Sequence, residues 1–171
     1  QASKANGRAT AYSNTEYSEY KNNLGKNMVS KEEFSRIMND KSEKKLFKHY
    51  TDSVKNGDVS PLTDYDTYQK IATELREKCI GLKTSNGIEL KEISLHSIDR
   101  VIGSVERRRS GVTVDGIVEA LTSPDAKIMD PIYNKTKTKV SQKFIYKTTE
   151  VSVNPIDHIL IQANPHHRER E

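Results

Sequence analysis

The sequence predicts an α+β fold, in which an N-terminal helical extension precedes a unit of two helices and an antiparallel sheet of about four strands. Apolar residues recur at helical spacing through most of the chain up to residue 121, apart from one short alternating segment. Beyond residue 127 they alternate with polar residues or are β-branched, which favours strands. We expect an arm at 1–29, a helical extension at 30–84, a compact unit at 85–165 and a charged tail at 166–171.

Composition limits the classes of protein that fit. Hydrophobic residues make up 33% and aromatic residues 6% of the 171 residues, so the core is expected to be modest. A net charge of +4 suits a polyanionic partner, although many proteins are equally basic. Cys79 is the single cysteine, which excludes a disulfide framework and a cysteine-based zinc site. No apolar run is long enough to span a bilayer.

The first half is expected to be an arm followed by three helices. Residues 1–29 are polar and lack a period, which predicts an extended or disordered arm. Ser30 and Glu33 form a capping-box pattern at the start of a short helix that carries Phe34. Longer apolar stripes predict helices at 42–55 and 64–79, and Gly81 is a candidate C-terminal cap.

The second half is expected to hold a short strand, two helices and the sheet. The pattern predicts a strand at 88–93, a helix at 94–109 that Gly111 ends, and a helix at 114–121 that Thr113 caps. Strands are expected at 128–133, 140–147, 150–153 and 158–163. A hairpin turn at 154–157 joins the last two, and the tail after Pro165 is expected to fray.

His96 and Arg100 are the first candidates for chemistry. They are four residues apart, so both project from one side of the predicted helix. An imidazole transfers protons near neutral pH, and a guanidinium binds phosphate through two parallel hydrogen bonds. The pair therefore suits RNA cleavage in which a 2′-hydroxyl attacks the neighbouring phosphate. The alternative is structural, with His96 packing at the helix start and Arg100 paired with an acidic neighbour.

Two basic segments are candidates for substrate binding. Arg107, Arg108 and Arg109 lie at the predicted helix end, where they either clamp a substrate or complement the helix dipole. No acidic residue occurs from 132 to 149, which favours contact with an RNA backbone or, alternatively, a solvated strand face. Five lysines occur in this segment: Lys135, Lys137, Lys139, Lys143 and Lys147. In one extended strand Lys143, Lys147 and Thr149 would share a face, and Tyr146 and Thr148 the other.

The other histidines and motifs point to no cofactor. His158 is expected at a turn and the pair His166 and His167 in the tail, where histidines are more often incidental than catalytic. Neither a metal-ligand spacing nor a P-loop or dinucleotide fingerprint is visible in the sequence. We therefore expect chemistry that needs neither metal nor cofactor.

Several short runs resemble phage members of the Barnase–EndoU–colicin–RelE (BECR) nuclease superfamily. The C-terminal part also resembles the closing hairpin of those toxin domains, with Asp157 and His158 where that hairpin often has Gly-Lys. An upstream run resembles the linker that ends MuF-type phage head morphogenesis proteins. The runs are 95–103 (LHSIDRVIG), 108–112 (RRSGV), 118–121 (VEAL), 151–155 (VSVNP), 159–165 (ILIQANP) and, upstream, 17–26 (YSEYKNNLGK).

The resemblance implies a polymorphic toxin whose site combines a helix-supplied histidine with residues of one concave sheet face. It implies His96 as general acid or base and Arg100 as phosphate ligand. The sheet would add either Lys147 and Thr149 or Tyr146 and Thr148, and Arg107 to Arg109 and Lys143 would bind substrate.

We therefore expect a toxin endoribonuclease, a hydrolase-type nuclease that cleaves RNA, with tRNA as one candidate. Expected partners are RNA, a cognate immunity protein and phage head proteins on the N-terminal side. The protein itself is expected to be virion-associated and to act in the bacterial cytoplasm. One alternative is a non-catalytic, head-associated module that binds nucleic acid. A weaker one is an ADP-ribosyltransferase, whose sequence pattern is not visible.

Overall fold

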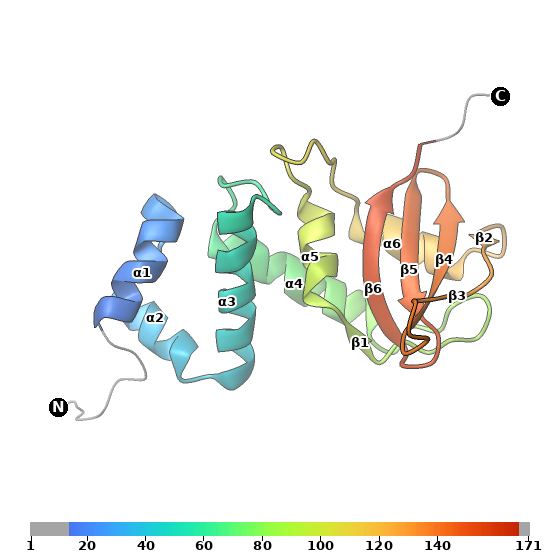
Figure 1. Ribbon diagram of the computed structural model, residues 1–171, viewed down its shortest axis with the longest axis horizontal. Coiled ribbons are helices and arrows are strands. Elements are labelled where there is room, and N and C mark those ends of the chain that lie inside the picture. Colours follow the sequence, from blue (N-terminus) through green and yellow to red (C-terminus); the bar gives the residue numbers. More distant parts are fainter. Residues whose placement is uncertain (1–13, 168–171) are drawn as a thin grey trace.

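The computed structural model describes residues 14–167, which form an α+β fold with the helices of the first half beside a C-terminal sheet (Figure 1). The six helices in this part of the chain are Asn14–Leu24 (α1), Lys31–Met38 (α2), Lys41–Asn56 (α3), Tyr65–Cys79 (α4), Leu95–Ile102 (α5) and Val114–Thr122 (α6), with a 3-10 turn at Gly25–Asn27 (η1). The strands are Glu92–Ile93 (β1), Lys127–Ile128 (β2), Ile132–Tyr133 (β3), Val140–Tyr146 (β4), Thr149–Asn154 (β5) and Ile159–Pro165 (β6).

The helix starts agree with the capping residues in the sequence. Ser30 accepts a hydrogen bond from the Glu33 amide at 3.1 Å, as the capping-box pattern predicts. Asp40, Asp64 and Thr113 cap α3, α4 and α6 in the same way. Each cap satisfies amides that the first helical turn leaves without partners, so the starts of these helices are fixed locally.

The N-terminal segment differs from the expected arm, because residues 14–24 form helix α1. Its helix carries Tyr17 and Tyr20, whose rings pack against Phe34 at centroid distances of 5.2 and 5.3 Å. Tertiary packing of these aromatic rings stabilises a helix whose own sequence is polar. The part of the expected arm at 1–13, and the tail at 168–171, lie outside the described residues.

Helix α5 is shorter than the helix predicted at 94–109. It ends at Gly103, which has a φ of 83°. A Cβ atom at this position would lie 2.5 Å from the backbone nitrogen of Gly111, so the chain turns sharply where only glycine fits. Residues 104–109 form turns instead, closed by a bridge between Ser104 and Arg109.

The sheet is mixed, whereas an antiparallel one was expected. Its order is β1-β6-β5-β4-β2, and β3 also pairs with β4. Strand β1 runs parallel to β6, and the other pairs are antiparallel. A turn at Lys147 and Thr148 separates β4 from β5, so the predicted strand that carried both Lys147 and Thr149 does not exist. The predicted hairpin turn is confirmed, because the Asn154 side chain accepts from the amides of Ile156 and Asp157.

The two faces of the sheet differ. The inner face, which includes Phe144, Val151 and Ala163, belongs to a core that continues through α6 and α5 into the N-terminal helices. In Figure 1, α6 lies behind the sheet, and none of the helices in residues 14–167 covers the face turned toward the viewer. We call this second face the open sheet face; strand alternation gives it Lys143, Glu150, Ser152, Gln162 and Asn164. None of the described helices is long and apolar enough to cross a membrane.

Candidate active site

The register of β4, β5 and β6 places polar side chains in two rows across the open sheet face. Lys143 pairs with Ser152, and Ser152 with Gln162. In the neighbouring row Glu150 pairs with Asn164. Side chains that are opposite in an antiparallel pair lie within contact distance. The face therefore gathers an ammonium, a carboxylate and two amides around Ser152, which is itself buried.

Glu150 is at the centre of the charged groups on this face. Its Oε2 lies 3.5 Å from Lys143 Nζ, and its Oε1 lies 3.6 Å from Nδ1 of His166. The His166 amide donates to the Thr148 carbonyl at 2.7 Å, which extends the β5–β6 ladder past the end of β6. The Glu150 side chain is 20% exposed and that of His166 is 32% exposed, so solvent and a substrate can reach both.

Arg100 reaches the same face from helix α5, which packs along β6. Its Nη1 donates to Oδ1 of Asn164 at 3.0 Å. Asn164 is the cross-strand partner of Glu150, so the guanidinium lies beside the Glu150 row. A guanidinium has five N–H donors, and this contact uses one of them. The rest can bind an anion such as phosphate.

A pocket of about 390 Å³ lies at the other end of the open sheet face. Ser141, Asn154 and Ile159 form part of its floor. The segment around β3 forms one wall, on which the Tyr133 side chain is 54% exposed. An exposed aromatic ring beside a polar sheet face can stack on a nucleobase.

The structure separates the sheet residues predicted for the site. Lys143 lies on the open sheet face with Arg100, as described above. Thr149 is buried on the inner face, where its Oγ1 would touch a Cβ atom added at Gly116 of α6. Tyr146 packs partly against the core, and the Lys147 ammonium lies 5.2 Å from the centre of its ring. Thr148 is exposed in the turn.

The three arginines do not lie at a helix end, because α5 stops before them. Arg107 forms an ion pair with Asp58 at 2.7 Å and donates to the Asn56 carbonyl. Arg109 is half-buried and donates to the Asp58 carbonyl at 3.4 Å, and burial lowers its pKa. Arg108 is exposed. The first and third arginines therefore fasten the 104–109 turns to the end of α3. The predicted position of the three arginines at the end of their own helix is wrong, because α5 ends at Ile102.

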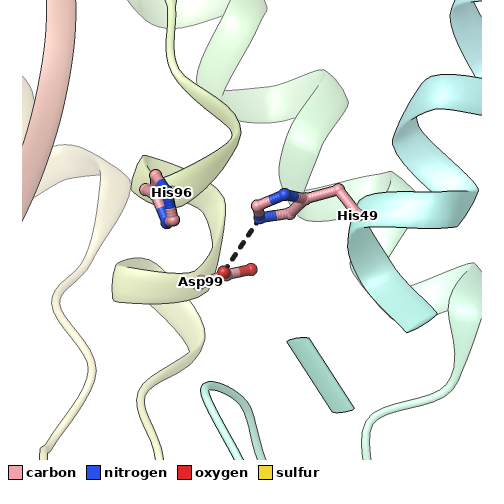
Figure 2. Close-up of side chains that lie close together, drawn as sticks. All are labelled: His49, His96 and Asp99. Carbon is pink, nitrogen blue, oxygen red and sulfur yellow. Dashed lines mark hydrogen bonds and ion pairs between the residues drawn. The ribbon is translucent and has the colours of Figure 1, made fainter. Parts of the chain in front are cut away.

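His96 lies in a second group of polar side chains, between α5 and α3 (Figure 2). Its exposed ring stands edge-on to the ring of His49, with centroids 5.3 Å apart and an interplanar angle of 84°. His49 Nε2 lies 3.0 Å from Oδ2 of the buried Asp99. We call these three residues the His49–His96–Asp99 cluster. Among the described residues, no hydrogen bond or ion pair joins it to Glu150 or His166.

Two further residues bind Asp99 from the neighbouring helices. Ser53 of α3 donates to Oδ2 at 2.8 Å, and Tyr68 of α4 donates to Oδ1 at 2.7 Å. Burial, with the Asp99 charge adding to it, raises the pKa of Tyr68, so its hydroxyl stays protonated and donates. The carboxylate thus holds α3, α4 and α5 together.

Sequence reasoning missed Glu150 and His166 on the sheet, and His49 on α3. Strand alternation alone could have placed Glu150 on the face opposite to that of Val151. Its approach to Lys143 depends on the β4–β5 register, which the turn at 147–148 sets. The sequence predicts that His166 lies in a fraying tail, whereas its amide continues the β5–β6 ladder. The approach of His49 to Asp99 joins residues 50 positions apart, and no local pattern encodes it.

Comparisons with known proteins give no relative for this chain. No family model matches it, and neither the curated proteins nor the solved structures contain a match. The fold class and the two polar groups therefore rest on the structure itself.

Proposed function

We propose that this protein is an endoribonuclease that cleaves RNA by metal-independent transesterification on the open sheet face. The observation that carries the proposal is the position of Glu150 between Lys143 and His166, with Arg100 beside it. A carboxylate, an imidazole and two cations on one solvent-accessible surface are the groups that this reaction needs.

Each group has a role in the proposed reaction. Glu150 takes the proton of the 2′-hydroxyl, whose oxygen attacks the neighbouring phosphorus. Protonated His166 gives a proton to the leaving 5′-oxygen. Lys143 and Arg100 stabilise the negative charge that develops on the phosphoryl oxygens. The products are a 2′,3′-cyclic phosphate and a 5′-hydroxyl.

The pocket beside Tyr133 would hold a base of the substrate. It lies on the same sheet face as Glu150, and its lining combines an aromatic ring with the polar groups of Ser141 and Lys139. Stacking on an aromatic ring tolerates any base, and the polar groups add preference. This arrangement favours a single-stranded RNA segment, such as a loop of tRNA, as the substrate.

The wider context follows from the resemblance to phage toxins and is part of the same proposal. The protein would be a toxin carried with a phage head, acting in the bacterial cytoplasm and neutralised by a cognate immunity protein. Acid–base work by His96 stays a prediction; its exposed ring is accessible, and its partner would then be His49 rather than a sheet residue.

One observation favours a second function, the binding of nucleic acid without cleavage. Lys135, Lys137 and Lys139 are all exposed on the segment between β3 and β4. Such a cationic loop can hold a phosphate backbone of any sequence. A module of this kind would bind DNA or RNA strongly at low salt and leave it intact.

The test is incubation of the purified protein with total RNA in the presence of EDTA. We compare the wild type with H166A and H96A, and with H167A as a matched control, because His167 is also an exposed histidine. We expect cleavage by the wild type and by H167A, and a loss of about 10²–10⁴-fold in H166A. The H96A result tests the separate prediction for His96.

Two outcomes would contradict the proposal. RNA that stays intact with folded wild type excludes the nuclease, and binding without cleavage favours the nucleic-acid-binding module. Cleavage that EDTA abolishes, while circular dichroism shows that the protein stays folded, would show that the reaction needs a metal.

A further inference from the structure

We propose that the His49–His96–Asp99 cluster binds a transition-metal cation of the Zn²⁺ type, which joins helix α3 to helix α5. Each of the three side chains offers one ligand atom, and these atoms lie within 4.8 Å of one another. Figure 2 shows the two rings and the carboxylate grouped between α3 and α5. No metal-ligand spacing is visible in the sequence, because one ligand is on a separate helix.

The geometry needs one adjustment to enclose a metal ion. Ligand bonds of about 2.0–2.1 Å in a tetrahedral zinc site place neighbouring ligand atoms about 3.3 Å apart. His49 Nε2 and Asp99 Oδ2, at 3.0 Å, are already close to this separation. The wider gap involves His96, which is exposed and for which the structure gives no hydrogen bond within residues 14–167. Rotation of this side chain can close the gap.

The ligand set selects the class of metal. Imidazole nitrogens suit zinc, copper, nickel and cobalt, whereas magnesium and calcium require oxygen ligands. Two histidines and one carboxylate therefore favour Zn²⁺. Three protein ligands leave a fourth position for water, as in zinc sites that are not closed by protein.

The surroundings of Asp99 support a ligand role for this carboxylate. Hydrogen bonds from Ser53 and Tyr68 hold its two oxygens in a fixed orientation, as second-shell groups do in metal sites. The Asp99 side chain is 3% exposed, and its hydrogen-bond partners are two hydroxyls and one imidazole. A buried carboxylate is stable only when its charge is compensated. A metal bound by Asp99 and His49 would replace the contact between them and supply a positive charge at this carboxylate.

This site is independent of the proposed reaction of Glu150 and His166, although it includes His96 and His49, the two residues of the separate acid–base prediction. It uses neither the open sheet face nor the pocket beside Tyr133, and it links α3 of the N-terminal helices to α5, which packs on β6. The metal would fasten these two parts of the molecule together.

The experiment is a titration of the metal-free full chain with Co²⁺, followed by displacement with Zn²⁺. Co²⁺ reports its own geometry, because tetrahedral coordination by nitrogen and oxygen gives an intense visible absorption. We expect one ion per chain, displaced by Zn²⁺. Loss of the His96 ligand in H96A should weaken binding by more than the roughly 10–100-fold that second-shell changes cost. The variant H167A, which removes another exposed histidine, should bind as the wild type does.

The variant H49A gives a second measurement, with circular dichroism to confirm that it folds. It should also lose the Co²⁺ absorption. The proposal is overturned if the wild type binds neither ion in the micromolar range, or if H96A binds as tightly as the wild type. It is also overturned if H167A, and not H96A, loses binding, because the ion would then sit in the C-terminal segment. RNA cleavage enters none of these readouts, so failure of the metal site leaves the ribonuclease proposal untouched.

Discussion

Asp99 shows how one residue determines the arrangement of several helices. It lies on α5, and its carboxylate binds His49 and Ser53 of α3 and Tyr68 of α4. A buried carboxylate is costly unless its oxygens are satisfied, so these contacts restrict how the three helices can pack. The same carboxylate orients His49 and offers the third ligand atom of the proposed metal site.

The variant Tyr68→Phe tests the contribution of this network to stability. It removes one donor and leaves Oδ1 of Asp99 without its partner, so we expect the free energy of unfolding to fall by about 1–3 kcal/mol. Urea unfolding measures this fall in the free energy of unfolding, provided that the m-value is the same for the variant and the wild type. Tyr133→Phe is the matched control, since the Tyr133 side chain is exposed, and its change should stay within about 0.5 kcal/mol. Equal stability of the two variants would contradict this account.

At the scale of elements, the helix starts depend on local side chains. Asp64 accepts from the Thr67 amide at 2.8 Å, and this hydrogen bond holds the pKa of the Asp64 carboxyl below its usual range. A carboxyl with a lowered pKa stabilises the folded protein most above its unfolded pKa. The stabilisation is lost as the pH falls through the lower pKa of the folded state.

The variant Asp64→Ala should therefore cost about 0.5–2 kcal/mol of unfolding free energy near neutral pH. The difference in unfolding free energy between this variant and the wild type should become smaller in acid, because the wild-type carboxyl is then protonated. Asp66→Ala is the control from the same helical turn, because the Asp66–Lys70 pair is exposed and its loss should change stability little. Urea titrations at several pH values measure both variants. A cost for Asp64→Ala that does not change with pH would argue against the cap.

The elements also show which features a sequence can predict. The starts of α2, α4 and α6 were predictable, since each depends on a cap within three residues of the amide it satisfies. Helix α1 was not, because its tyrosines are stabilised by Phe34 and Phe47, which lie later in the chain. Strand β1 pairs in parallel with β6, and such a long-range pairing leaves no local pattern.

The candidate site was predictable only in part, for the same reason. Arg100 and Lys143 were found from their charge and spacing, and both lie on the open sheet face. Glu150 and His166 join them only through the register of β4, β5 and β6, which the turn at 147–148 sets. A shift of one residue in this register would turn Glu150 to the inner face.

At the scale of the whole molecule, the two proposals involve two different parts of the surface. One core runs from Leu24 on α1 to Ala163 on β6, so the helices and the sheet support each other. The sheet presents a solvent-accessible face for RNA, and the contact between α3 and α5 presents the His49–His96–Asp99 cluster. The ribonuclease reaction and the metal site can therefore be tested separately on the same protein.

The most direct test of the central proposal is the chemistry of the cleaved RNA end. A short RNA oligonucleotide is incubated with the wild-type protein in EDTA, and the products are identified by mass spectrometry. Transesterification by Glu150 and His166 predicts a 2′,3′-cyclic phosphate on one fragment and a 5′-hydroxyl on the other, with no cleavage of the 2′-deoxy oligonucleotide. A 3′-hydroxyl with a 5′-phosphate, or an intact oligonucleotide, would contradict it.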